Sequence, residues 1–414
     1  MVNNKVKNDV NVTPFMEKLK KAFTLQFFIK CIVLIVFLAG FAGLIYYANY
    51  DKPGYYTTAD SGKEFEVGKV LKVIDDKAKP DPEYENVMRG SQMLRIEILT
   101  GRYQGDVVDV MNYLSGVIYN VYLHEGDSVS LQILTTGENE YDVTVYNYNR
   151  SYILIAFILI FVLSLCIVGG KRGFFAVLGL LFTMVAFIFI LVPLVLKGFP
   201  TLITTIAITS VTIFVSLYLL NGLHKKSVSA MIGTFAGVVF AGILAVIASW
   251  LCGISGFNMD EAESLFLVAR DCELKIKDLL ICGILIASLG AVMDVAMSIA
   301  SAIDELHTVN SKLTPHQLFK SGMNIGRDAM GTMANTLILA FAGTSLNMMI
   351  FIYAYGVTYV QLINTDFIAV ELIRGLSGTM GIIFTVPFVA FITSRIVSAH
   401  KHVNAKDNES DLNK

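Results

Sequence analysis

The sequence contains repeated apolar runs of about 18 to 25 residues, and this feature limits the possible folds more than any other. An α-helix rises about 1.5 Å per residue, so each run is long enough to cross the roughly 30 Å hydrocarbon core of a bilayer. With 55% hydrophobic and 16% charged residues, the chain also departs from ordinary soluble domains. The sequence therefore predicts a multi-pass membrane protein.

The apolar runs predict a bundle of about eight transmembrane helices. The first run is expected to be an uncleaved anchor, because it is long and no small-residue cleavage site follows it. The predicted spans cover residues 27–48, 151–169, 173–196, 201–221, 227–252, 279–303, 331–355 and 367–396. The resulting division has an N-terminal tail at 1–26, an anchor helix at 27–48, an extracytoplasmic segment at 51–149, a seven-helix domain at 151–396 and a C-terminal tail at 397–414.

The positions of lysine and arginine predict the orientation, since short cytoplasmic loops are enriched in these residues. With eight spans, the basic groups before the first span, after the second, after the fourth and after the eighth all fall on one side. These groups include Lys18, Lys20, Lys21, Lys171, Arg172, Lys225, Lys226, Arg395 and Lys401. Both termini are therefore expected to be cytoplasmic.

Residues 51–149 alternate between apolar and polar side chains, which is typical of β-strands with one buried face. The clearest runs are Leu94-Ile96-Ile98, Val129-Leu131-Ile133 and Val143-Val145. About five short strands in a hundred residues predict a small β-barrel of the OB or SH3-like kind, because closure removes exposed strand edges. Such a domain either binds a ligand or serves as a spacer or oligomer contact. Its 17 acidic against 9 basic residues argue against nucleic acid as a partner.

One acidic residue, Asp294, lies well inside the apolar run from Leu279 to Glu305. A carboxylate at this depth costs several kcal/mol unless it faces protein or water, so such residues are usually functional. The alternative is a carboxyl held neutral by a neighbouring hydroxyl that contributes only to packing. At helical spacing one face carries Gly283, Ala287, Gly290, Asp294, Ser298, Ser301 and Glu305.

Two more stretches carry polar side chains into apolar runs. Thr314, Pro315 and Gln317 match a capped helix start, and a polar face then continues through Asn324, Arg327, Asp328, Gly331, Thr332 and Asn335. The last predicted span contains Glu371 and Arg374 one turn apart, so the two charges can pair with each other. A depth difference of roughly 10 Å from Asp294 predicts no direct contact between Asp294 and Arg374.

Together, the last three spans predict a polar path for protons or a solute, in which Asp294 is the group expected to titrate. Small residues on the same faces are expected to allow close helix packing. The predicted path comprises Asp294, Ser298, Ser301, Glu305, Arg327, Asp328, Asn335, Glu371 and Arg374, and the predicted packing glycines are Gly283, Gly290, Gly378 and Gly381.

Three motifs in the same spans resemble the YibE/F-like family of bacterial multispan membrane proteins. They are GAVMDVAMSIASAIDEL, GRDAMGTMANTLILAFAG and ELIRGLSGTMGIIFTVP. The resemblance covers most of the chain from the β segment to the last span. It implies a bacterial plasma-membrane location and marks the last three spans, but it assigns no activity or substrate.

These observations leave two hypotheses for the function. The first is a secondary transporter of an unknown small solute or ion, with the proton as the candidate coupling ion. The second is a non-catalytic accessory protein whose residues 51–149 recruit a second copy or an envelope partner. No enzyme is expected, because the sequence has no HExxH, GxSxG or GxxxxGK[ST] motif and no second intramembrane aspartate.

No metal or cofactor is expected either. The six histidines form no ligand-spaced group with cysteine or carboxylate residues. The five cysteines are dispersed, and the sequence leaves open whether Cys252 pairs with Cys272. Membrane lipid is the remaining expected partner.

Overall fold

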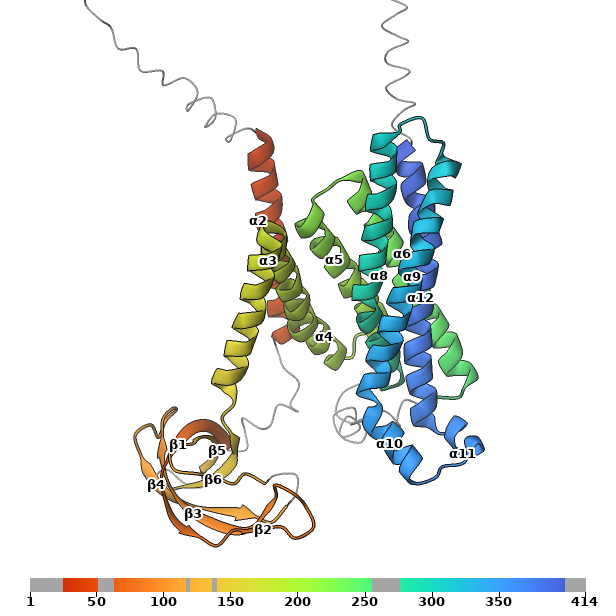
Figure 1. Cartoon of the computed structure of the whole chain (residues 1–414). Coiled ribbons are helices and arrows are strands. Elements are labelled where there is room, and N and C mark those ends of the chain that lie inside the picture. Colours follow the sequence, from red (N-terminus) through yellow and green to blue (C-terminus); the bar gives the residue numbers. More distant parts are fainter. Residues whose placement is uncertain (1–24, 51–62, 117–119, 136–139, 255–275, 399–414) are drawn as a thin grey trace, which may run out of the picture. The chain divides into compact units, whose positions relative to one another are not determined.

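A computed structural model of the chain describes residues 25–50, 63–116, 120–135, 140–254 and 276–398. The chain divides into two compact units. One unit comprises Pro53–Gly179 and contains all of the strands, while the other comprises the remainder of the chain and contains most of the helices (Figure 1).

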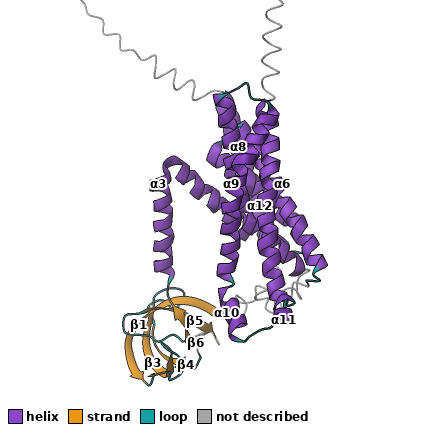
Figure 2. Cartoon of the chain, turned by 45° about the vertical axis from the view of Figure 1, so that its right-hand side comes forward, coloured by secondary structure: helices purple, strands orange, loops and turns teal. Residues whose placement is uncertain are grey.

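Six antiparallel strands form one curved sheet, shown in orange in Figure 2. The strand order is β2-β3-β1-β5-β6, and β4 pairs with β3. The sheet is a half-barrel: β4 and β6 contact each other, but no ladder of backbone hydrogen bonds joins them in the described residues. The strands are β1 Lys63–Asp76, β2 Lys79–Pro80, β3 Met88–Ile98, β4 Val107–Leu114, β5 Ser128–Thr135 and β6 Tyr141–Tyr148.

The predicted apolar alternation is confirmed in the core of this sheet. Leu94, Ile96 and Ile98 of β3 are fully buried, and so are the three alternating apolar residues of β5. The intervening Arg95 is exposed, where it donates two hydrogen bonds of 2.8 Å to Asp109 of β4. These hydrogen bonds lower the pKa of the Asp109 carboxyl.

A buried glutamine fastens the segment after β4 to the sheet. Gln92 of β3 is fully buried, its Nε2 donates to the carbonyl oxygen of Leu123 (3.0 Å), and its Oε1 accepts from the Leu123 backbone N–H (3.0 Å). Asn112 Nδ2 also donates to Gln92 Oε1, at 3.3 Å. Without this side chain, the buried backbone groups of Leu123 lose their partners.

We expect the substitution Gln92→Leu to destabilise this unit by about 2 kcal/mol, because it leaves buried backbone polar groups unsatisfied. Hydrogen exchange of the full chain, followed by mass spectrometry, measures the effect as faster exchange at the Leu123 amide and in β3. Gln132→Leu is the matched control, because Gln132 is partly exposed and its side chain makes no hydrogen bond within the described residues. Equal protection in both variants would contradict the assigned role of Gln92.

The helices of the other unit run mostly side by side (Figure 1). Short connections join α5 to α6 and α8 to α9, while α10 and α11 lie between α9 and α12, together at one end of the unit. The helices are α2 Leu25–Asn49, α3 Ser151–Ala186, the π-helix η1 Phe187–Leu191, α4 Val192–Leu196, α5 Thr201–Asn221, α6 Lys225–Leu251, α8 Ile276–Val309, α9 Pro315–Thr344, α10 Leu346–Ala354, α11 Tyr359–Ile363 and α12 Asp366–Ser398.

Within the described residues, five helical segments are long and apolar enough to cross a membrane, and the bent pair α9 and α10 would make a sixth. One of the five, Ser151–Leu196, has 46 residues. At 1.5 Å per residue it would measure about 69 Å, twice what one span needs. It breaks at Gly170 (φ 55°, ψ −132°), next to Lys171 and Arg172, where the sequence predicts a connection between two spans.

The predicted anchor helix, α2, packs on the segment formed by η1 and α4. Asn49 Nδ2 donates to the carbonyl oxygen of Phe189 (2.9 Å), and Lys197 Nζ donates to that of Tyr47 (2.7 Å). These polar contacts supplement a small apolar cluster that includes Ala48 and Ile190. The first apolar run is therefore joined to the helices that follow the sheet.

The region predicted as one span over 331–355 has a different form. A single helix, α9, begins at Pro315 with the predicted capping box of Thr314 and Gln317, and it ends at Thr344. The chain then bends by 61° into α10. The physical cause is local: Thr344 Oγ1 donates to the carbonyl oxygen of Phe341 (2.8 Å), and Ser345 leaves the helical conformation.

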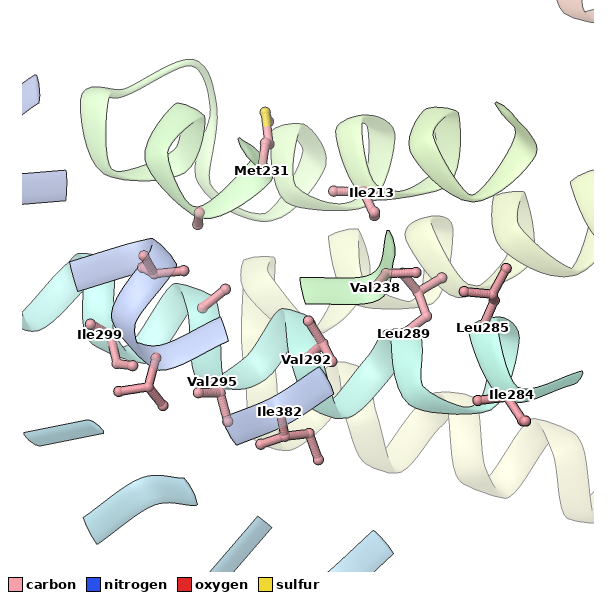
Figure 3. Close-up of a cluster of buried hydrophobic side chains, with 14 of the residues drawn as sticks. Ile213, Met231, Val238, Ile284, Leu285, Leu289, Val292, Val295, Ile299 and Ile382 are labelled. Atoms are coloured by element: carbon pink, nitrogen blue, oxygen red, sulfur yellow. The ribbon is translucent and has the colours of Figure 1, made fainter. Parts of the chain in front are cut away.

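The core of the helical unit is centred on α8. Figure 3 shows Val292, Val295 and Ile299 of α8 among apolar side chains from the neighbouring helices, including Val238 of α6 and Ile382 of α12. These five residues are almost fully buried. The three α8 residues form its covered side, so the polar side of α8 must point in another direction.

Candidate functional site

The three helices that carry the predicted polar path pack against one another. A Cβ placed on Gly326 of α9 would lie 3.0 Å from Ile299 Cδ1 of α8 and 2.2 Å from Val386 Cγ1 of α12. Gly322, one turn earlier, similarly faces Ile303 of α8. Because glycine has no side chain, α9 can pack closely against both α8 and α12, and α9 contacts both helices.

Asp294 does not point into this group of helices. Asp294, Ser298 and Glu305 are exposed, and Ser301 is partly exposed. A Cβ added at Gly283 or Gly290, on the same side of α8, would meet nothing within 4 Å. In the described part of the chain, the polar side of α8 is therefore open along its length.

No hydrogen bond or ion pair from a described residue reaches the carboxylate of Asp294. The side chains that contact other helices leave α8 in other directions: Leu285 faces Gly242 of α6, and Cys282 lies beside Thr205 of α5. Within the described residues, the Asp294 carboxylate is thus left without a protein partner.

The polar face of α9 is also open, on the side away from α8 and α12. Arg327, Asp328 and Asn335 are exposed, and a Cβ at Gly331 would meet nothing within 4 Å. At 100° per residue these positions point away from Gly322 and Gly326, which face α8 and α12. The structure thus places the polar residues of α8 and α9 on two separate outer faces.

Glu371 and Arg374 of α12 form a close pair. Arg374 Nη1 donates to Glu371 Oε1 at 2.7 Å, and the side chains are only 28% and 14% exposed for Arg374 and Glu371 respectively. The second oxygen, Glu371 Oε2, is buried and has no hydrogen-bond partner among the described residues. A buried carboxylate oxygen without a donor is unusual and calls for a ligand or water.

The pair lies at a different depth from Asp294. Ser288 of α8 lies beside Gly378 of α12, so Arg374, four residues earlier, is near the level of Ile284. That level is about ten residues, or roughly 15 Å, from Asp294. The two groups are therefore not in contact, as the sequence predicts. Gly378 and Gly381 lie in helix contacts, the latter beside Ala241 of α6.

Two adjoining cavities flank the Glu371–Arg374 pair at the bend between α9 and α10, and we call them together the α9–α10 pocket. The smaller has a volume of about 170 Å³ and is almost entirely apolar. The larger has a volume of about 430 Å³ and mixes polar with aromatic side chains. Ser345, Phe367 and Glu371 line both.

The sequence identifies two residues of this pocket, Glu371 and Arg374, but not those at the bend. Thr344, Ser345 and Asn347 sit in an apolar run and belong to none of the predicted polar faces. The signal that marks them is the Gly343-Thr344-Ser345 sequence, because small and hydroxylated residues in succession weaken a helix.

A family model of the YibE/F-like protein matches residues 157–399, more than half of the chain. The chain belongs to the YibE/F-like family. The matched region starts within α3 and includes α8, α9 and α12, with all of the polar residues described above, and it excludes the strands. No curated protein and no solved structure matches the chain. Membership in the YibE/F-like family and the long apolar helices together make this a multi-pass membrane protein.

In the described ranges, no three or more histidine, cysteine or acidic side chains come together as a group that could hold a metal ion. Cys252 is exposed. Cys272, which could pair with it, lies outside the described residues, so this pairing stays a prediction.

Proposed function

We propose that this YibE/F-like protein is a secondary transporter of a small solute in the bacterial plasma membrane. The observation that supports this most directly is the α9–α10 bend, with a pocket and a half-buried ion pair beside it. Interrupted membrane helices form the substrate sites of many secondary transporters, and charges within spans are rarely without a role. The proposal includes no enzymatic step and no cofactor.

Asp294 is proposed to carry the coupling proton. It lies within a span of high hydropathy, where an ionised carboxylate facing lipid would cost several kcal/mol. On the open side of α8, the side chain is stable when water or a second chain covers it. A carboxyl that meets water in one state and apolar groups in another binds and releases a proton between the two states.

The proposed topology has eight spans with both termini in the cytoplasm. Its support is the break at Gly170, which divides a helical segment too long for one crossing. The basic pairs Lys171-Arg172 and Lys225-Lys226 would then lie on the cytoplasmic side. The β-sheet unit would lie on the opposite side of the membrane.

A second candidate function is an accessory membrane protein, and one observation favours it. The polar faces of α8 and α9 point outward on different sides, and neither surrounds a cavity within the described chain. Polar and small residues on a membrane helix are typical of contacts with other helices. In this alternative these faces bind other membrane chains, and the sheet unit binds an envelope partner.

We expect Asp294→Asn to reduce proton movement into proteoliposomes at least tenfold. The experiment imposes a membrane potential on vesicles containing the full chain and follows a trapped pH-sensitive dye. Proton movement falls because a side-chain amide does not take up and release a proton at the pH of the assay. Asp294→Glu, which keeps a carboxyl group, should retain proton movement. Asp278→Asn, at the start of the same helix, is the matched control and should behave like the unmodified chain.

The two candidate functions give opposite results. If Asp294→Asn has normal flux, while removal of residues 51–149 abolishes the cellular phenotype of a deletion strain, the accessory function is correct. If the flux is lost in Asp294→Asn and the truncated chain still moves protons, transport is correct.

A further inference from the structure

The α9–α10 pocket has a chemical character that specifies its ligand. Sixteen residues line its two cavities, and Glu371 and Arg374 are the charged ones among them. Since these two charges cancel, the lining has no net charge. A ligand with a net charge would bring an uncompensated charge into a partly dehydrated site, which is costly. The pocket therefore favours a ligand whose own charges cancel.

Glu371 offers a hydrogen-bond acceptor to this ligand. Its Oε1 already accepts from Arg374, while the buried Oε2 has no partner in the described chain. Leaving such an oxygen unsatisfied costs about 1–3 kcal/mol, and more for a charged group. An ammonium group supplies both the N–H donor and the positive charge that a carboxylate oxygen binds best.

Arg374 requires an acceptor. The guanidinium has five N–H donors, and Nη1 makes the one hydrogen bond to Glu371. The side chain lines the larger cavity together with Thr344 and Asn347, which supply further polar groups. A planar guanidinium with free donors matches the oxygens of a carboxylate or a phosphate.

The smaller cavity requires an apolar group. Ile338, Phe341, Leu372 and Leu376 line it, and Glu371 lies where it joins the larger cavity. Its volume of about 170 Å³ is comparable to that of cavities of about 150 Å³ that accept benzene. A branched aliphatic or phenyl group attached next to an ammonium would fill it.

We propose that the α9–α10 pocket binds an amphiphilic zwitterion. The ammonium would bind the Glu371 carboxylate, the anionic oxygens would bind Arg374, and the apolar part would fill the smaller cavity. Two sources share this chemistry: a free apolar amino acid, and a membrane lipid with an amine-bearing phosphate headgroup. The inference rests on the proposed function where it makes this ligand the transported solute, whereas binding itself requires no transport.

The test measures binding to the purified full-length protein in detergent. Isothermal titration calorimetry uses L-leucine and L-phenylalanine, with N-acetyl-L-leucine and L-leucinamide as the forms that lack the ammonium and the carboxylate. Native mass spectrometry compares retained phosphatidylethanolamine with phosphatidylglycerol. A free amino acid as ligand predicts that both altered leucines bind at least tenfold more weakly than L-leucine. A lipid as ligand predicts selective retention of phosphatidylethanolamine and no binding of the amino acids.

Three variants assign the binding to this pocket. Glu371→Gln preserves shape and should weaken binding at least tenfold, and Ala342→Phe should do the same by filling the apolar cavity without touching the ion pair. Arg395→Gln, an exposed arginine in the last turn of the same helix, is the control and should bind normally. The proposal is overturned if no probe binds, or if binding is unchanged in both pocket variants.

Failure of this inference is distinguishable from failure of the proposed function. If proton flux depends on Asp294 but neither probe class binds, the ligand class is wrong and transport stands. If a zwitterion binds and Glu371→Gln removes it, while no flux depends on Asp294, the pocket is a ligand site of a protein that does not transport protons.

Discussion

Replacing Gly237 with leucine is expected to prevent the packing of α6 against α12 and to abolish the folded helical unit. A Cβ at Gly237 would lie 1.8 Å from Thr385 Oγ1 of α12 and 3.2 Å from Val292 Cγ1 of α8. Thr385 and Val292 are both fully buried, so neither can move aside. The helices would have to separate, at a cost that exceeds the roughly 1–3 kcal/mol of ordinary overpacking.

The matched control is Gly290→Leu. Gly290 also lies inside a long helix, so leucine improves helix propensity similarly at both positions. A Cβ there would meet nothing within 4 Å, because it lies on the open side of α8. Size-exclusion chromatography and thermal unfolding of the detergent-purified full chain should show loss of the monodisperse species for Gly237→Leu alone. Equal stability of the two variants would mean that the α6–α12 contact does not hold the unit together.

This contrast also shows what the sequence could and could not establish about α8. Helical periodicity assigns Gly283, Gly290 and Asp294 to one face, and the structure agrees. The opposite face, with Val292 and Ile299, is equally periodic. Hydrophobic spacing alone does not say which of two faces neighbouring helices cover, because in a membrane both small-polar and branched apolar faces can pack.

The bend at Ser345 shows a second limit. Hydropathy over residues 331–355 is continuous, so the run reads as one straight span. The end of α9 depends on the side chain of Thr344, which average hydropathy does not register. The α9–α10 pocket arises from this bend. Of its lining residues, the sequence therefore predicts a functional role only for the two charged residues of α12, Glu371 and Arg374.

In the other unit, the sequence predicts the buried face of the strands but not how the strands pair at the edges of the sheet. The alternation around Leu94 and Leu131 identifies the buried face correctly, because period-two spacing follows from strand geometry. Which strands pair at the edges is a long-range property. The sheet accordingly has the predicted buried residues, but no ladder joins β4 to β6 in the described residues, and the curve stays a half-barrel.

Replacing Arg374 with leucine is expected to destabilise the helical unit by about 3 kcal/mol and to abolish transport. The substitution removes the donor to Glu371 Oε1 and leaves a carboxylate that is 14% exposed with no partner on either oxygen. Removal of one partner of a buried ion pair typically costs about 3–5 kcal/mol. Unfolding of the full chain in mixed micelles, by titration with sodium dodecyl sulfate, measures this loss.

A double variant separates stability from function. Adding Glu371→Gln to Arg374→Leu removes the unpaired charge, so the double variant should recover most of the lost stability. Transport should stay absent, because both groups proposed to hold the ligand are gone. If Arg374→Leu alone is as stable as the unmodified chain, water reaches the Glu371 carboxylate, and burial of the ion pair contributes little to the free energy of unfolding. If the double variant regains proton flux, the pair only stabilises the fold, and the solute must cross by a route that avoids the α9–α10 pocket.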